Sequence, residues 1–357
     1  MEAPEDDAPE DDAQERAHFQ SIIRAYDEYA AWATAKVDRL ESHYHKLATH
    51  DQELLSLATK VEAMRKAIRQ NAIVLNMIVD PHRGHVGAAE EQLSTRVRRV
   101  PLADMDKMQS TLKQFVREWS VEGSIEREAA HRPLLDALQR AVPSSALRGV
   151  RVLLPGAGLG RLAWEVAMLG YQAQASEFSY FMLLASNFIL NRLQPLGCVT
   201  VHPWVLQSCN VKSREDQMRG IKVPDVAPWS LPPAANLSMC AGDFLEVYGN
   251  QSNCWESVAT CFFIDTAHDV ATYIRLIRQL LVVGGAWVNL GPLLWHFSDD
   301  PHEVSIDLTW EELRVLIQDA GFLIEHESWH RCPYVRNPRS MYLMEYDAIC
   351  FVARWRG

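Results

Sequence analysis

The sequence predicts an α/β protein in which an all-helical N-terminal region precedes a Rossmann-like sheet of seven strands. Over residues 150–357, short apolar runs alternate with segments of helical spacing, which is typical of a largely parallel sheet with crossover helices. Over residues 18–142, apolar residues recur at the three- and four-residue spacing of amphipathic helices. A glycine-rich turn at residues 156–160 joins the first apolar run of the sheet region to a helix.

The N-terminal region is expected to contain four helices, of which the first two form a hairpin. Asp51 is a suitable N-cap for the second helix. Residues 81–94 are interpreted as a loop, in which His82 and His85 lack the companions at ligand spacing that a metal site needs. The four helices are expected at residues 18–47, 52–78, 104–119 and 125–142.

Residues 1–15 differ in composition from the rest of the chain. Eight of these fifteen residues are acidic and none is basic, so that without them the formal net charge would change from −11 to −3. We expect a disordered acidic tail at 1–15, a helical region at 16–148 and the sheet domain at 149–357. A docking tail for a basic partner is the alternative interpretation of the first segment.

Seven strands are expected in the sheet region, the last two of them antiparallel. The helix at 309–320 begins with a capping box of Thr309 and Glu312. Residues 195–234 contain several prolines and no clear period. The strands are expected at residues 152–154, 172–177, 236–241, 258–265, 286–290, 322–329 and 344–355, and the other helices at 180–193 and 270–281.

The glycine turn and the acid after the second strand predict a site for a nucleoside-bearing cofactor. Gly156, Gly158 and Gly160 let the backbone approach a ligand closely, and Glu177 can accept hydrogen bonds from both hydroxyls of a ribose. The dinucleotide fingerprint requires glycine at the position of Arg161, which argues against NAD or FAD. This spacing is instead typical of class I S-adenosylmethionine-dependent methyltransferases.

Two further acids follow strands of the expected sheet. In this fold, an acid at the place of Asp243 binds the adenine amino group and the neighbour, here Phe244, stacks on the ring; a simple turn acid is the alternative. Asp265 ends the fourth strand, where many methyltransferases keep a group facing the methyl acceptor, and a carboxylate buried there without a purpose is costly. As an N-cap for the next helix, Asp269 or Thr266 would serve better than Asp265.

Two histidines lie near these candidates. His296, flanked by Trp295 and Phe297 beyond a Gly-Pro turn, either lines an acceptor pocket or is a packed loop histidine. We interpret His268 as a helix-start residue rather than a catalytic one.

Composition excludes several classes of protein. No apolar run is long enough for a membrane span, and the N-terminus lacks the apolar region of a secretory signal. The body of the chain has no large basic excess, which speaks against nucleic-acid binding. The seven cysteines fit neither a zinc site nor a disulfide framework, so we expect a reduced protein of the cytoplasm or nucleus without a metal. Cys261 and Cys350 lie in apolar runs, where cysteine is usually a core residue.

Five motifs closely resemble the carnosine N-methyltransferase family. The resemblance runs from the N-terminal helices to the last strand and leaves only the acidic segment outside. It implies transfer of a methyl group from S-adenosylmethionine to an imidazole nitrogen of carnosine, which gives anserine. The motifs are residues 113–120 (Lys-Gln-Phe-Val-Arg-Glu-Trp-Ser), 154–165 (Leu-Pro-Gly-Ala-Gly-Leu-Gly-Arg-Leu-Ala-Trp-Glu), 241–244 (Ala-Gly-Asp-Phe), 262–268 (Phe-Phe-Ile-Asp-Thr-Ala-His) and 289–297 (Asn-Leu-Gly-Pro-Leu-Leu-Trp-His-Phe).

The resemblance also implies roles for individual residues. Gln114 and Arg117, one helical turn apart, would reach the cofactor from the N-terminal region, with Arg117 on its carboxylate. Asp265 and His296 would be catalytic residues, with Asp265 fixing the imidazole tautomer. The further cofactor residues implied are Gly156, Gly158, Glu177, Asp243, Phe244 and Cys261, and the substrate contacts are Asp265, His296, Tyr334 and Tyr346.

Three alternatives stay open at this point. The acceptor is carnosine or a related histidine-containing peptide, or else a histidine side chain within a protein. A catalytically inactive methyltransferase-like binding protein is the alternative from another class, and an NAD-dependent dehydrogenase is disfavoured by Arg161. A homodimer formed through the N-terminal helices is also open.

Overall fold

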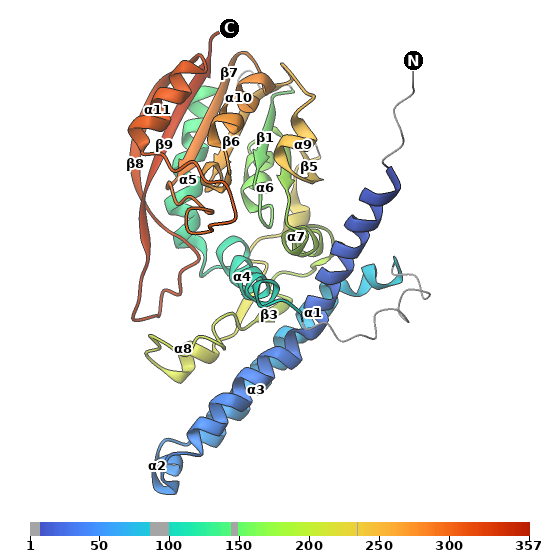
Figure 1. Ribbon diagram of the computed structural model, residues 1–357, viewed down its shortest axis with the longest axis vertical. Helices are drawn as coiled ribbons and strands as arrows, with labels where there is room; N and C mark the ends of the chain where they lie inside the picture. The colour runs from blue at the N-terminus through green and yellow to red at the C-terminus, as the bar shows by residue number, and fades with distance from the viewer. Residues whose placement is uncertain (1–7, 86–99, 144–148, 234) are drawn as a thin grey trace. The chain divides into compact units, whose positions relative to one another are not determined.

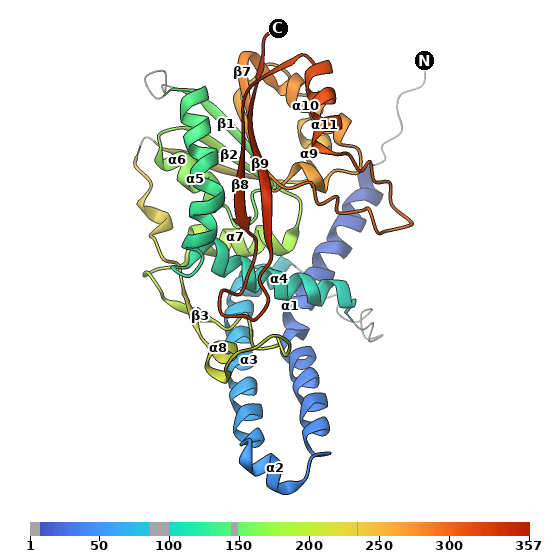
Figure 2. The same ribbon diagram turned by 90° about the vertical axis from the view of Figure 1, so that its left-hand side faces the viewer.

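The computed structural model describes residues 8–85, 100–143, 149–233 and 235–357, which divide into two compact units (Figures 1 and 2). One unit contains the seven-stranded sheet and comprises residues 117–192, 225–338 and 343–357. The other comprises residues up to 116 together with 193–224 and 339–342. The predicted boundary at 148/149 therefore differs from the observed division, because residues 117–143 pack with the sheet and the 193–224 excursion packs with the N-terminal helices.

The sheet has the strand order β5-β2-β1-β6-β7-β9-β8, which confirms the class I methyltransferase fold. The neighbours from β5 to β7 are parallel, and β9 pairs antiparallel with both β7 and β8. The last two strands are thus antiparallel, as predicted. The bounds are β1 (Arg151–Pro155), β2 (Gln172–Glu177), β5 (Asn236–Ala241), β6 (Trp255–Cys261), β7 (Leu281–Gly291), β8 (Phe322–Pro333) and β9 (Glu345–Trp355).

Helices cover both faces of this sheet, so that the unit has three layers (Figure 2). Alternating residues of the strands face opposite layers: Leu154 packs with α5 and α6, whereas Leu153 packs with α10 and α11. Side chains of the central strands are buried on both faces, which explains their continuous apolar patterns. The helices of this unit are α5 (Ser124–Ala141), α6 (Arg161–Met168), α7 (Tyr180–Arg192), α9 (Phe244–Tyr248), α10 (Val270–Leu280) and α11 (Trp310–Asp319), with the 3-10 turns η3 (Pro228–Ser230) and η4 (Ile264–Thr266).

The other unit is built on a hairpin of two long helices, as predicted (Figure 2). The buried amide of Asn71 binds the Tyr29 hydroxyl and both backbone groups of His202, which ties the hairpin to β3. Helix α4 runs through the division, with residues 102–116 in this unit and 117–119 in the sheet unit. The bounds are α1 (Ala8–Tyr44), α2 (Thr49–Leu54), α3 (Leu57–Val79), η1 (Asp80–His85), α4 (Leu102–Trp119), β3 (Val199–Val201), α8 (Arg214–Met218) and β4 (Ile221–Val223).

The N-terminal segment corrects two expectations. Helix α1 begins at Ala8, within the expected acidic tail. An acidic segment is compatible with a helix start because the helix dipole favours negative charge there. The first seven residues and residues 86–94 of the expected loop lie outside the described residues. The predicted helix at 52–78 is two helices, because Ser56 adopts a left-handed φ of +46° between them. Asp51 consequently lies in the first turn of α2 rather than at an N-cap.

The fourth strand ends four residues earlier than predicted. Phe262 has a φ of +53°, which breaks the extended conformation directly after Cys261. Asp265 therefore lies in the turn η4 and not at the end of β6. The apolar run in the sequence extends beyond the end of β6 at Cys261, because the turn that follows also buries apolar side chains, those of Phe263 and Ile264.

Candidate active site

Both internal glycines of the turn after β1 are required by the fold itself. Gly156 has a φ of +68° and Gly158 one of +56°, which other residues rarely adopt. A Cβ atom on Gly156 would lie 2.5 Å from the ring of Phe263, and one on Gly158 would lie 2.6 Å from a carboxylate oxygen of Glu118. Only glycine fits at either position, and the turn that the sequence predicted is confirmed.

Glu177 at the end of β2 is fixed by three backbone N–H groups. Its Oε2 accepts from Gly158 at 2.8 Å, and its Oε1 accepts from Phe178 and Ser179 at 3.0 and 2.9 Å. Burial raises the pKa of the carboxyl, and the three N–H groups act in the opposite direction. Two carboxylate oxygens offer about four lone-pair positions, so the geometry leaves acceptor capacity for a ribose hydroxyl.

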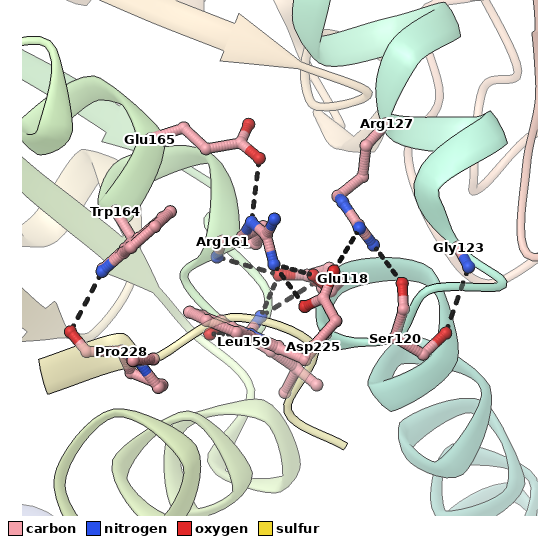
Figure 3. A network of polar contacts seen from close by, with 12 residues as sticks. Glu118, Ser120, Gly123, Arg127, Leu159, Arg161, Trp164, Glu165, Asp225 and Pro228 are labelled. Carbon is pink, nitrogen blue, oxygen red and sulfur yellow. Dashed lines mark hydrogen bonds and ion pairs between the residues drawn. The ribbon is translucent and has the colours of Figure 1, made fainter. Parts of the chain in front are cut away.

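A second carboxylate, which sequence reasoning did not select, holds the other side of the turn (Figure 3). Glu118 accepts hydrogen bonds from the backbone N–H groups of Leu159, at 3.0 and 3.1 Å, and Arg161, at 3.2 Å. Glu118 is buried, which raises the pKa of its carboxyl, whereas Arg117 lowers it. In sequence this residue stands on an amphipathic helix beside Arg117, where an acid normally belongs to a solvated face.

Arg161, at the position where a dinucleotide site has glycine, belongs to the same buried network (Figure 3). Its guanidinium donates to Asp225 at 2.7 Å and to Glu165 at 2.8 Å. Asp225 also accepts from Arg127 at 2.6 Å, and Arg127 donates to the backbone carbonyl of Arg117 at 2.8 Å. The network therefore fixes the glycine turn and the end of α4 relative to each other.

Arg117 is part-buried at the end of α4. Its Nε lies 3.6 Å from Oε2 of Glu126, and its guanidinium carbon lies 4.7 Å from the ring centre of Tyr334 and 5.6 Å from that of Phe262. Gln114 precedes it by three residues in the same helix. Gln114 belongs to the other unit, and its predicted cofactor contact stays a prediction.

The structure gives Asp243 the turn role that was the alternative interpretation. Its Oδ1 accepts from the backbone N–H groups of Leu245 and Glu246 and caps α9. Phe244 is buried in an aromatic cluster, with ring-centre distances of 5.5 Å to Phe263 and 5.2 Å to Tyr273. The proposed adenine contacts of both residues stay predictions.

Cys261 ends β6, close to Arg117. Burial raises the pKa of its thiol to about 12, and Arg117 acts in the opposite direction. The thiol is therefore protonated at neutral pH, which suits a packing contact rather than nucleophilic chemistry.

Asp265 and His296 are brought together. Oδ2 of Asp265 accepts from the backbone N–H of Leu294 at 3.0 Å, and its backbone carbonyl accepts from the N–H of His296 at 3.1 Å. Burial raises the pKa of the Asp265 carboxyl to about 6. Asp269 caps α10 instead, so helix capping does not explain Asp265.

His296 is exposed as a whole residue. Its ring is nevertheless partly desolvated, which lowers the pKa of the imidazole. Its imidazole is therefore neutral at neutral pH. His268, by contrast, stacks on Phe297 at a ring-centre distance of 3.7 Å and makes a hydrogen-bond contact of 3.1 Å with the carbonyl of Val304. These contacts support a structural role for His268, as expected.

Tyr334 and Tyr346 converge on one ring. Phe262 stacks on Tyr334 at 4.8 Å and meets Tyr346 edge-on at 6.3 Å. The antiparallel register places Cys332 of β8 opposite Tyr346, so both tyrosines lie at the same end of the β8–β9 pair. In the sequence, Phe262 is one of several apolar residues in a row, so its contact with the two tyrosines could not be predicted. The structure shows this contact because the strand ends before Phe262.

No metal centre or membrane span is found in the described part of the chain. Across residues 8–85, 100–143, 149–233 and 235–357, no group of three or more histidine, cysteine or acidic side chains has metal-binding geometry. Within the same ranges, no helix is both long enough and apolar enough to cross a bilayer.

Comparison with known proteins identifies the family of this chain. The family model described as carnosine N-methyltransferase matches residues 94–356. The mouse protein named carnosine N-methyltransferase is 42% identical over 95% of this chain and 86% of its own length, and the Drosophila melanogaster protein named carnosine N-methyltransferase unmet is 38% identical over 96% and 80%.

Among solved structures, the Burkholderia thailandensis 1,6-didemethyltoxoflavin-N1-methyltransferase has a TM-score of 0.39 at 17% identity, over 73% of this chain and 92% of its own. It was solved with 1,6-didemethyltoxoflavin and S-adenosylhomocysteine bound. The family model and the sequence relatives decide the assignment: the chain belongs to the carnosine N-methyltransferase family.

Proposed function

We propose that this protein is an S-adenosylmethionine-dependent enzyme that methylates an imidazole nitrogen of carnosine, β-alanyl-histidine, to give anserine. Membership of the family supports the reaction, and the names of the mouse and Drosophila relatives support the acceptor. The single structural observation that carries the proposal is Asp265, a buried carboxylate that caps no helix and adjoins His296.

The residues on the cofactor side fit S-adenosylmethionine. The glycine turn excludes side chains, and Glu177 presents a carboxylate of fixed orientation at the end of β2. When bound, the cofactor supplies an electrophilic methyl group on a sulfonium centre. Glu177 would bind a ribose hydroxyl, and Arg117 would bind the methionine carboxylate through its Nη atoms.

Asp265 would select the tautomer of the acceptor. A free imidazole has a pKa of about 6.5, so most of it is neutral at physiological pH and needs no strong general base. Asp265 would accept a hydrogen bond from the N–H of the non-reacting nitrogen. The other nitrogen then has a free lone pair that can be directed at the methyl group. Its negative charge then stabilises the imidazolium that forms.

Neutral His296 and the two tyrosines would orient the rest of the dipeptide. The lowered pKa keeps His296 able both to donate and to accept a hydrogen bond. Tyr334 and Tyr346 contact Phe262, which directly follows β6 in the segment that leads to Asp265. Positioning of this kind supplies much of the rate enhancement of a bimolecular transfer.

The proposal is tested by a methyl-transfer assay on the full chain with labelled S-adenosylmethionine and carnosine. We expect anserine, identified by mass spectrometry against the synthetic compound. A parallel reaction offers a protein extract as acceptor, followed by mapping of methylated histidines. Label in protein histidines but not in the dipeptide would replace carnosine by a protein acceptor, and cofactor binding without any transfer would indicate a binding protein.

We further propose a reducing compartment, the cytoplasm or nucleus, as the place of action. All seven cysteines are free thiols, which supports this proposal. Fractionation of cells that express the tagged full chain tests it, and accumulation in the secretory pathway would contradict it.

A further inference from the structure

One buried carboxylate without a role in the proposed reaction, Glu126, lies between Arg117 and the segment after Tyr334. Glu126 lies in the first turn of α5 and is 6% exposed. Its Oε2 accepts from the backbone N–H of Val335 and its Oε1 from that of Arg336, both at 2.8 Å. These two consecutive N–H groups belong to the segment that follows Tyr334, more than 200 residues along the chain.

The same carboxylate faces Arg117. Oε2 of Glu126 lies 3.6 Å from Nε of Arg117, and the Arg117 guanidinium lies 4.7 Å from the Tyr334 ring. Tyr334 in turn stacks on Phe262. Glu126 therefore contacts the proposed cofactor residue directly and the proposed acceptor residue through the backbone of its neighbour.

The position of Glu126 at a helix N-terminus does not account for these contacts. The helix dipole stabilises an acid in the first turn even when its carboxylate is in water, so this stabilisation does not require burial. Burial of a carboxylate is itself unfavourable unless hydrogen bonds or charges compensate it. Val335 has a φ of +47°, a conformation that is strained for a β-branched residue and persists only where its surroundings hold it. The two hydrogen bonds of Glu126 act on this strained segment directly.

We propose that Glu126 is a positioning residue that sets the Tyr334 ring for the acceptor dipeptide by holding the backbone of Val335 and Arg336. The inference rests on the proposed function. Glu126 does not touch the reacting atoms, and its two hydrogen bonds to the segment after Tyr334 act on acceptor binding.

The test is Glu126→Gln, with Glu128→Gln as the matched control because Glu128 is an exposed acid on the same helix. An amide offers one acceptor oxygen and turns an NH2 group toward the second N–H. We expect the KM for carnosine to rise about tenfold, equivalent to about 1.4 kcal/mol, with kcat within threefold of wild type. The cofactor Kd is measured separately, because the substitution also removes the charge that faces Arg117. A merely structural role would lower the active fraction and hence kcat, with KM unchanged.

A double-mutant cycle with Tyr334→Ala separates positioning from other effects. If Glu126 acts through Tyr334, Glu126→Gln should not raise KM further in the Tyr334→Ala background. Additive effects on KM, or an unchanged KM in the single variant, would overturn the inference.

Amide hydrogen exchange supplies a readout that does not depend on the acceptor. We expect the protection of the Val335 and Arg336 amides to fall at least tenfold in Glu126→Gln and to stay unchanged in Glu128→Gln. Unchanged protection in Glu126→Gln would refute the positioning role even if the enzyme acts on another acceptor. Failure of the wild-type protein to form anserine, with the protection lost as expected, would count against the proposed substrate alone.

Discussion

The cofactor side and the acceptor side of the site hold their carboxylates in different ways. Glu177 accepts from three backbone N–H groups and Glu118 from two, whereas the side chain of Asp265 accepts from the N–H of Leu294 and is also stabilised by its own backbone N–H. The first pair is fixed by the turn between β1 and α6 and by its neighbours. Asp265 is buried with less compensation, and burial raises its pKa to about 6. A pre-organised cofactor side thus adjoins an acceptor side whose charge is poised near neutral pH.

The largest expected effect comes from breaking the acceptor side. Asp265→Asn keeps the size of the side chain and removes the charge that would select the tautomer and stabilise the imidazolium. We expect kcat for carnosine methylation to fall by about 10²-fold or more, because removal of one stabilising group of this kind has that effect in other enzymes. Steady-state kinetics and calorimetry would give kcat and the cofactor Kd, which should stay within threefold of wild type.

The control for that variant is Asp299→Asn, since Asp299 is an exposed acid a few residues beyond His296. Its turnover should match wild type. Full turnover in Asp265→Asn would remove Asp265 from the reaction and leave only a structural role for it.

A substitution on the cofactor side should instead weaken cofactor binding and leave kcat nearly unchanged. Glu177→Gln leaves three N–H donors facing a single acceptor oxygen, and an unsatisfied buried group costs about 1–3 kcal/mol. We expect the Kd for S-adenosylmethionine to rise roughly 10- to 100-fold, while kcat at saturating cofactor changes less than threefold. Isothermal titration and turnover at high cofactor concentration would measure the two quantities.

Glu311→Gln, an exposed acid at the start of α11, is the matched control and should bind cofactor normally. A drop in kcat with unchanged cofactor affinity in Glu177→Gln would contradict the contrast between the two sides.

The difference between the sides also explains what the sequence could predict. The glycine turn and Glu177 depend on contacts between neighbouring elements, β1, α6 and β2, and these follow from spacing. Of the alternatives for Asp265, the structure removes helix capping, because Asp269 occupies that role as the sequence indicated. The roles of these residues could therefore be predicted from the sequence, because their partners are close along the chain.

The rest required tertiary contacts that no local pattern encodes. Glu118 and Glu126 stand on amphipathic helices where acids are normally solvated, and their partners lie 41 and 209 residues away. Phe262 was hidden in an apolar run that continues through a turn, so the end of β6 was misplaced. The tyrosines came from the family resemblance alone, and the structure supplies their shared contact with Phe262.

The smallest expected effect is on pH dependence, and it tests whether Asp265 on the acceptor side titrates near neutrality. Catalysis needs Asp265 ionised and the imidazole of carnosine neutral, with pKa values of about 6 and about 6.5. Two protons should therefore be lost on the acid limb, so that the slope of log kcat/KM against pH approaches 2 below about pH 5. In Asp265→Asn, only the substrate titrates, and the slope should be near 1.

Thermal stability gives an independent check, because the stability contribution of Asp265 should fall as the pH rises, whereas the activity should increase. Because the folded-state pKa of Asp265 is raised from its ordinary value of 3.8, the folded protein binds more protons than the unfolded chain between about pH 4 and pH 6. The contribution of this group is present below pH 4 and is lost as the pH rises through 6. The Tm of the wild type relative to Asp265→Asn should therefore increase as the pH is lowered from 7 to 5. A Tm difference that is constant over this range, together with equal slopes in the kinetic profiles, would show that Asp265 does not titrate between pH 5 and pH 7.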